Sequence, residues 1–120
     1  MKPFFLLLLT VVVMASPALA AGDAKRGKTL YAQCAACHSQ DPAKKTLGPH
    51  LKGVLGRKAG GLEGYVYSPP MRRSTVVWTA QTLGAYLADP QAVVRGTKMP
   101  FSGLATSRDR DDLIAYISMP

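Results

Sequence analysis

The sequence predicts a small all-α domain whose long loops are organised by a bound group. Helical spacing of apolar residues near both ends of the chain, over residues 23–36 and 106–117, indicates two terminal helices. Between them, residues 39–78 are rich in glycine and proline, which is typical of loops. A loop stretch of that length is unusual in a compact domain unless something else organises it. The run Cys34-Ala35-Ala36-Cys37-His38 is the part of the sequence that could hold such a group.

Residues 1–20 have the pattern of a secretory signal peptide. Lys2 gives a positive start, Phe4 to Met14 is almost wholly apolar, and Ala18-Leu19-Ala20 supplies small residues before the cleavage point. The apolar run is about half of the ~20 residues that span a bilayer. We therefore predict cleavage after Ala20 or Ala21, with no stable membrane insertion afterwards. The alternative is an uncleaved, membrane-anchored form, which N-terminal sequencing would reveal.

Residues 21–120 then form a single domain. Removal of the leader takes away only Lys2 as a charge, which leaves fourteen basic and seven acidic side chains and a formal net charge of +7. Such a surplus favours acidic partners or an anionic surface. Nucleic acid is the other usual partner of a basic protein, but an exported location and the lack of a nucleic-acid motif argue against it.

The two terminal helices are expected to cross. Asp23 is a suitable N-cap for the first, and Thr106 or Ser107 for the last. Their inward faces are given by Gly27, Leu30 and Tyr31 in the first helix and by Leu113, Tyr116 and Ile117 in the last. A glycine allows another backbone to approach closely. We predict that the helices cross at Gly27, with Tyr31 and Tyr116 packed around the contact.

A third helix is predicted from about Thr79 to Ala88, with Leu83, Tyr86 and Leu87 facing inward. Asp89-Pro90 would end or break it, and Gln91 to Arg95 would add one or two turns before Gly96. The region from 39 to 78 is read as ordered loops, with a short helix near His50–Leu55.

Cys34-Ala35-Ala36-Cys37-His38 matches the attachment sequence of c-type haem. Two thiols three positions apart can each add to a vinyl group of one porphyrin, which leaves the next imidazole beneath the iron. A zinc ribbon would need a second ligand pair, but the chain has no further cysteine. A thioredoxin-like pair would need a βαβ context, and a disulfide across so short a loop would stabilise little. The leader agrees with haem attachment, which takes place outside the cytoplasm.

The iron would need a ligand opposite His38, and four residues could supply it: His50, Met71, Met99 and Met119. His50 follows Pro49 too closely to cross easily to the other face, and Met119 lies at the chain end. Met71 suits an apolar lining role. Met99 lies in a Gly- and Pro-bounded loop between two helices, so we favour Met99. His/Met ligation raises the reduction potential and fills the sixth position, which describes an electron carrier rather than an oxygen-activating enzyme.

Taken together, these residues and the motifs Leu47-Gly48-Pro49, Gly56-Arg57-Lys58, Tyr65 to Trp78 and Gly96-Thr97-Lys98-Met99 resemble class I c-type cytochromes. The resemblance covers essentially the whole of residues 21–120 in order. The branch that the chain resembles is the one that contains mitochondrial cytochrome c and its soluble bacterial relatives. It implies the small all-α cytochrome c fold, in which the terminal helices cross and loops wrap around one covalent haem c.

The resemblance also implies a role for each position. Cys34 and Cys37 would form the thioethers, and His38 and Met99 the axial bonds to iron. The Pro49 carbonyl would accept the other ring N–H of His38, Tyr86 would lie near the methionine sulfur, and Phe101 would shield the haem. The residues expected around a buried propionate are Arg57, Tyr65, Tyr67 and Trp78. The chain departs from the mitochondrial pattern at Met71, where that branch has asparagine, and at Arg95, where proline is frequent.

The function that follows is a soluble, monomeric periplasmic carrier of single electrons, not an enzyme. Its partners would be acidic redox proteins: an oxidase, a photosynthetic reaction centre or a dehydrogenase. Lysines that could steer them are Lys28, Lys44, Lys45, Lys52 and Lys98. The alternative is a haem enzyme or gas sensor with an open or labile sixth iron site.

Overall fold

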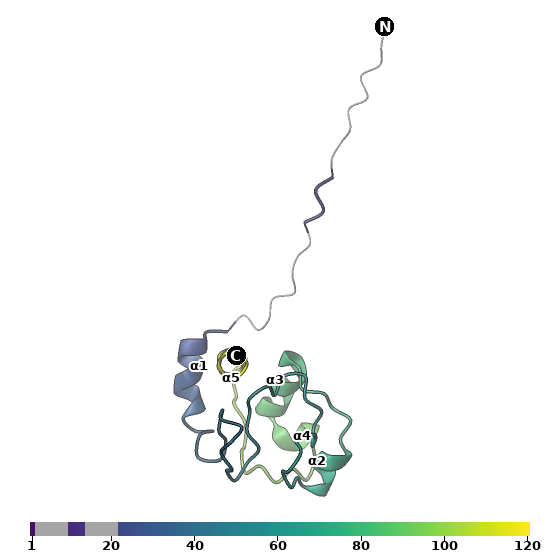
Figure 1. Ribbon diagram of the computed structural model, residues 1–120. Helices are drawn as coiled ribbons and strands as arrows, with labels where there is room; N and C mark the ends of the chain where they lie inside the picture. The colour runs from purple at the N-terminus through teal and green to yellow at the C-terminus, as the bar shows by residue number, and fades with distance from the viewer. Residues whose placement is uncertain (2–9, 14–21) are drawn as a thin grey trace.

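The structure, a computed structural model, describes residues 1, 10–13 and 22–120. Most of the predicted leader and both predicted cleavage points lie outside the described residues. Within them the chain forms five helices and no named strand, which confirms the all-α class (Figure 1). The helices are α1 (Ala24–Tyr31), α2 (Pro69–Arg73), α3 (Ala80–Ala88), α4 (Pro90–Val93) and α5 (Ser107–Ile117). None of the described helices is long and apolar enough to cross a membrane.

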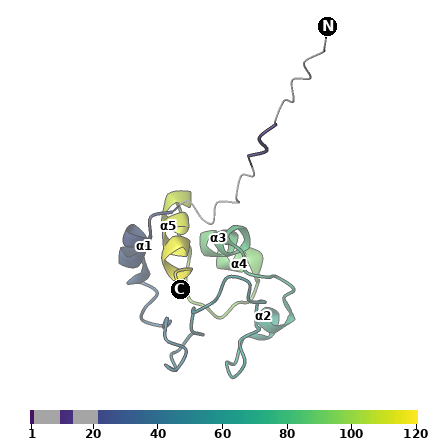
Figure 2. The ribbon, with the colours of Figure 1, turned by 45° about the horizontal axis from the view of Figure 1, so that its top comes forward.

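The first and last helices cross at Gly27, as predicted. The two helices lie side by side although they come from opposite ends of the domain (Figures 1 and 2). A Cβ atom built on Gly27 would lie 1.9 Å from the carbonyl oxygen of Asp112 and 2.8 Å from Cβ of Tyr116. Only glycine allows this separation between the two backbones. The rings of Tyr31 and Tyr116 pack beside the contact at a centroid distance of 5.2 Å.

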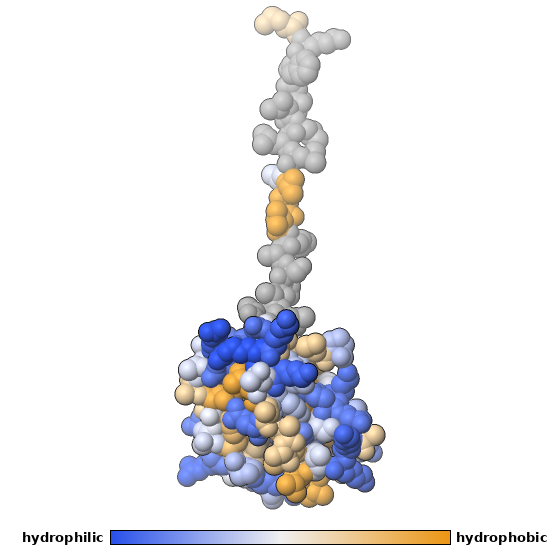
Figure 3. All heavy atoms as spheres, turned by 90° about the vertical axis from the view of Figure 1, so that its left-hand side faces the viewer, coloured by the Kyte–Doolittle hydropathy of each residue, from blue (hydrophilic) through white to orange (hydrophobic). Residues whose placement is uncertain are grey.

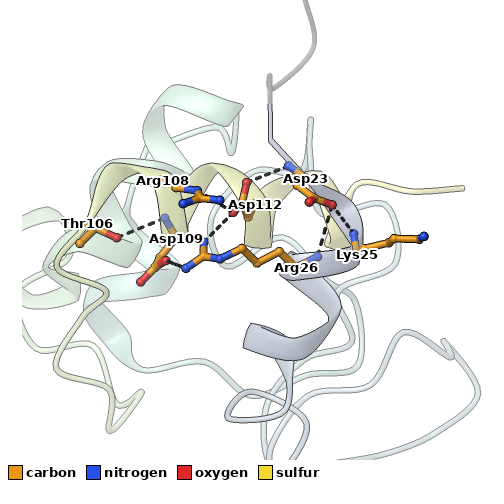
Figure 4. Close-up of polar contacts among 7 residues, drawn as sticks. All are labelled: Asp23, Lys25, Arg26, Thr106, Arg108, Asp109 and Asp112. Atoms are coloured by element: carbon orange, nitrogen blue, oxygen red, sulfur yellow. Dashed lines mark hydrogen bonds and ion pairs between the residues drawn. The ribbon is translucent and has the colours of Figure 1, made fainter.

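Ion pairs and hydrogen bonds hold the polar side of the same crossing (Figure 4). The Arg26 guanidinium bridges two carboxylates of α5, with 2.6 Å separations to both Asp109 and Asp112. Asp112 is 4% exposed and also accepts the backbone N–H of Asp23 at 2.7 Å. Because both Asp112 oxygens have partners, its burial leaves no orphaned charge. The acidic start of α5 therefore fixes the start of α1.

The pKa values of the two α5 carboxyls are lowered by these contacts. For Asp112 the main cause is the hydrogen bond from the Asp23 N–H, followed by Arg26. For Asp109 the main cause is Arg26, followed by Thr106, the N-cap residue of α5. Carboxylates stabilised in this way make the fold more stable when they are ionised than when they are protonated.

α3 packs against α5 and completes the core. Its three predicted inward residues, Leu83, Tyr86 and Leu87, are all buried. The capping box formed by Thr79 and Thr82 fixes where α3 begins. On α5, Leu113 and Ile117 are buried and Tyr116 is partly exposed. The apolar faces of α1, α3 and α5 therefore meet in one cluster.

The helices differ from the sequence predictions in four respects. α1 ends at Tyr31 rather than near Ala36, since residues 32–37 form turns that place the cysteine motif. The prediction of a short helix near His50–Leu55 is wrong, because these residues form turns. α4 covers Pro90–Val93 rather than 91–95, and α2 was not predicted at all. In both cases a proline read as a breaker occupies the first helical turn, after Asp89 or Ser68 as N-cap, where its missing N–H costs nothing.

The long loop region is held by backbone pairing rather than by helices. Two segments run antiparallel, and the bridge between Lys58 and Val77 is their centre. Around it, Gly56 N–H donates to the Trp78 carbonyl, Trp78 N–H to Arg57, and Ala59 N–H to Val76. Ala59 and Trp78, which belong to this ladder, are both buried, and Trp78 packs on Tyr86 of α3. The predicted ordered loops therefore exist, with this short ladder as their support.

The Gly27 crossing gives a stability prediction. Gly27→Ala is expected to lower the free energy of unfolding by about 2–3 kcal/mol, because the new methyl group overlaps the Asp112 carbonyl. Gly84→Ala in α3 is the matched control, since its Cβ would meet only Ile114 Cδ1, at 3.8 Å. That substitution should gain about 0.5–1 kcal/mol from helix propensity. Guanidinium unfolding followed by Trp78 fluorescence measures both; equal effects at the two glycines would refute the crossing.

The ion pairs predict an acid-sensitive contribution. Because the folded pKa values of Asp109 and Asp112 lie below the ordinary 3.8, their stabilisation is present above that pH and lost as the pH falls through the folded values. Arg26→Gln should therefore destabilise the protein most at neutral pH and progressively less below about pH 4. Lys25→Gln, the same charge change at an exposed neighbour, should give a small effect with no such trend. A constant difference between Arg26→Gln and wild type at every pH would contradict the assignment.

A haem-sized cavity lined by thiols, an imidazole and thioethers

A largely apolar cavity of about 440 Å³ lies between the helices and the loops. Its volume falls in the range of cofactor sites. α5 contributes Leu113 and Ile117 to the wall, and α3 contributes Leu83 and Leu87. No carboxylate is among the described residues that line it. A flat apolar group with its own anionic edge would suit such walls better than a small polar substrate.

The cysteine motif forms one side of this cavity directly after α1. Cys34 N–H bonds to the Tyr31 carbonyl at 2.8 Å, and His38 N–H bonds to the Cys34 carbonyl at 2.9 Å. These turns bring the side chains of Cys34, Cys37 and His38 to the same cavity. Both cysteines are free thiols, and burial raises the pKa of Cys34. The pair is thus available for thioether formation.

His38 is held with one ring nitrogen available. Its Nδ1 lies 2.7 Å from the Pro49 carbonyl oxygen, which can only accept, so Nδ1 carries the proton. This leaves Nε2 as the ring nitrogen free to bind a metal. A Cβ on Gly48 would lie 2.6 Å from His38 Cε1, so the approach of this loop requires glycine. The Tyr31 hydroxyl also donates to the His38 carbonyl at 3.0 Å.

The loop that carries Met99 forms another part of the lining. Thr97, buried at 7% exposure, shares a 2.8 Å hydrogen bond between its Oγ1 and the Tyr86 hydroxyl. Burial raises the pKa of Tyr86, which stays protonated and able to donate. Phe101 N–H bonds to the Met99 carbonyl at 2.9 Å, which turns the chain directly after the methionine. Met99 and Phe101 both line the cavity.

Hydrogen-bond donors gather on the loop side of the cavity. Arg57 donates to the carbonyls of His50 and Lys52, and Tyr67 accepts the Leu62 N–H. The Tyr65 hydroxyl donates to the Leu47 carbonyl, and its ring packs edge-on against Tyr67 at 4.6 Å. Trp78 packs on Tyr86 with ring centroids 4.9 Å apart. Burial lowers the pKa of Arg57, whose charge has no carboxylate partner among the described residues.

Lys98 closes the rim beside Met99. Its Nζ donates to the Val66 carbonyl and lies 4.9 Å from the centroid of the Tyr65 ring, a cation–π distance. The side chain thus joins the Met99 loop to the loop that precedes α2. Leu47 and Val66 beside this contact are 80% and 74% exposed.

The structure brings every predicted haem-site residue to this one cavity. They are Cys34, Cys37, His38, Pro49, Arg57, Tyr65, Tyr67, Trp78, Tyr86, Met99 and Phe101. Of the four residues considered for the second iron ligand, Met71 and Met99 line the cavity, whereas His50 and Met119 do not. Met71 is buried in α2, a helix that was not predicted.

Several lining residues were not predicted as part of the site. Thr97 and Tyr31 are the most informative, because each holds a segment that carries a candidate ligand. The Thr97 position could have been suspected from its place two residues before Met99. Nothing in the sequence indicates the Tyr31 hydroxyl bond, since its helical spacing predicts only a packing role.

Paired thiols and an imidazole around a cavity of this kind define a haem protein of the covalent, c type. Comparison with known proteins agrees. The family model "Cytochrome c" matches residues 24–119. Cytochrome c2 of Rhodomicrobium vannielii is 44% identical over 108 residues, covering 89% of this chain and 86% of the relative. Cytochrome c-550 of Nitrobacter winogradskyi is 43% identical over 98 residues, with 81% and 90% covered.

A solved structure shows the same fold. Cytochrome cH of Methylobacterium extorquens superposes with a TM-score of 0.75 at 44% identity, covering 80% of this chain and 97% of that one. The chain therefore belongs to the cytochrome c family and is an electron-carrying monohaem cytochrome with one covalently attached haem c.

Proposed function

We propose that residues 21–120 are a periplasmic electron carrier released from the leader 1–20, with iron held between His38 and Met99. The observation that carries this proposal is the convergence of the two side chains on one cavity from distant parts of the chain. Because the Pro49 carbonyl is paired with Nδ1 of His38, Nε2 is the ring nitrogen that would bind the iron. We further propose that the protein works as a monomer and is not an enzyme, because both axial positions of the iron would be filled.

The residues of the chain suit repeated electron transfer. The bound haem supplies a one-electron ferric/ferrous couple. A thioether at Met99 favours the ferrous state and so raises the potential relative to harder ligands. Pro49 and Tyr31 restrain the His38 segment, and Thr97 restrains the Met99 loop. Ligands held from behind in this way move little when the charge of the iron changes.

Partner docking is proposed at the loop side of the cavity, where Lys98 and Arg57 contribute to its lining. Three of the seven acidic residues lie instead on α5, where Asp109 and Asp112 are paired with Arg26. Figure 3 looks onto the side that carries α1 and shows hydrophilic side chains gathered over its upper part, with smaller apolar areas below. Lys28, Lys44, Lys45 and Lys52 would add to the positive field. An acidic redox protein, whether oxidase, reaction centre or dehydrogenase, suits this distribution.

A haem enzyme or gas sensor with an open sixth site is the competing function. It would require Met99 to leave the iron. Two contacts oppose that movement: the Lys98 bond to Val66 and the Thr97 bond to Tyr86. The carrier function is therefore the better supported of the two.

Replacement of each cavity methionine tests the ligation. Ferric wild-type protein should be low-spin, show the weak near-infrared sulfur-to-iron band and take up cyanide slowly. Met99→Ala should lose the band and bind cyanide at least ~100-fold faster, since a coordination bond no longer has to break. Met71→Ala is the matched control, because that thioether lines the same cavity. A band that survives in Met99→Ala and disappears in Met71→Ala would reassign the ligand, and a high-spin wild type would favour the sensor.

Charge steering can be tested with small redox reagents of opposite sign. Electron exchange with anionic hexacyanoferrate should slow as ionic strength rises, whereas exchange with cationic hexaammineruthenium should accelerate. Replacing Lys44 and Lys45 with Gln should reduce the hexacyanoferrate rate several-fold at low salt. Replacing Lys25 and Arg108 with Gln removes the same charge beside the α1–α5 crossing and should change it less. Equal effects of the two double variants would remove the case for a steering face near the cavity.

A further inference from the structure

The side chain of Gln91 makes two hydrogen bonds from α4 to the backbone of the Met99 loop. Gln91, in the first turn of α4, accepts the Gly96 N–H on its Oε1 at 2.9 Å. Its Nε2 donates to the Thr97 carbonyl at 3.0 Å. One carboxamide therefore pairs with two consecutive residues of the backbone, the donor of one and the acceptor of the next. Both polar atoms of the side chain are therefore used to hold the backbone that leads to Met99.

The position of these two bonds matters because they fall just before Met99. The loop leaves α4 through the bond from Thr97 N–H to the Val94 carbonyl, at 3.0 Å. The Gln91 bonds add a side-chain support to the same residues. Beyond Thr97, Lys98 is tied to the Val66 carbonyl, and Pro100 follows Met99. The segment from Gly96 to Lys98 is thus held by hydrogen bonds to Gln91, Val94 and Val66.

We propose that Gln91 is a positioning residue for the sixth iron ligand: its carboxamide holds the loop in the conformation that presents Met99 to the cavity. The inference rests on the proposed ligation by Met99. Gln91 itself is exposed and does not line the cavity, so it acts only through the loop.

The chemistry of the side chain explains why an amide is needed. An amide accepts a hydrogen bond from Gly96 on one atom and donates one to Thr97 from another, and it carries no charge. A carboxylate in the same place would still accept the Gly96 N–H but would face the Thr97 carbonyl with a second acceptor. Alanine would release both backbone groups to water. Each lost bond weakens the closed loop relative to open forms.

The test compares Gln91→Ala and Gln91→Glu with wild type as ferric holoprotein at pH 7. Cyanide binding, which requires the loop to release Met99, should accelerate about three- to tenfold in both variants. The sulfur-to-iron band should also fade at a lower temperature than in wild type. Gln81→Ala is the matched control, since Gln81 is an exposed glutamine of α3 for which the described structure contains no side-chain hydrogen bond. It should match wild type in both measurements.

A second measurement does not depend on the ligand. Amide hydrogen exchange at Gly96 should be faster in Gln91→Ala than in wild type, because its acceptor is gone. Unchanged Gly96 exchange would overturn the proposal even if the iron ligand proved not to be Met99. Faster exchange together with an unchanged cyanide rate would show a support that does not position the ligand, and would also overturn it. A wild type without the sulfur band would count against the proposed ligation and hence the inference.

Discussion

The close approach of two backbones at Gly27 is the constraint on which the rest of the domain depends. Because α1 and α5 meet without a side chain between them at Gly27, the end of α1 at Tyr31 packs on Tyr116 of α5, and the cysteine motif follows from Cys34. Tyr31, the last residue of α1, then lines the cavity together with Leu113 and Ile117 of α5. The crossing therefore builds one wall of the site as well as joining the two ends of the domain. On its polar side, the ion pairs between Arg26 and the α5 carboxylates join the two helices and make their contact sensitive to acid.

Away from the crossing, the loops are held in place by hydrogen bonds between polar side chains and backbone carbonyls. Few of the residues between the first and third helices can form regular structure, so their backbone groups need other partners. Arg57, Tyr65 and Lys98 each donate to the carbonyl of a loop residue, and the ladder around Lys58 and Val77 pairs two more segments. These donors are the same residues that line the cavity. The site and the loops are consequently stabilised by one set of side chains, and a change to either affects both.

The sequence was most informative where chemistry or periodicity is strong. The motif from Cys34 to His38 has few meanings, and helical spacing identified the inward residues of α3 correctly. For α5 it identified Leu113 and Ile117 but missed Ile114, which is buried, while Tyr116 is partly exposed. Capping rules placed the start of α1 at Asp23 and the start of α5 at Thr106 or Ser107, of which Thr106 is the N-cap. The errors have a common physical origin in short segments. Proline ends a long helix but begins a short one well, which explains why α2 was missed. Contacts such as those of Tyr31 with His38 and Gln91 with Gly96 have no sequence period, because they depend on how separate loops meet.

The two proposed axial ligands are held by forces of different strength, and this difference bears on function. His38 follows a cysteine that would be bound covalently to the same haem, so its place is fixed even if individual hydrogen bonds open. Met99 has no such tether. Its loop is held by hydrogen bonds from the Gln91 amide, between Tyr86 and Thr97, and from Lys98 to the Val66 carbonyl. Each of these bonds alone contributes only a small free energy. Any exchange of ligand in this protein would therefore begin on the Met99 side. Those few contacts together would keep Met99 on the iron. They would thereby preserve the carrier function and keep small molecules from binding to the haem.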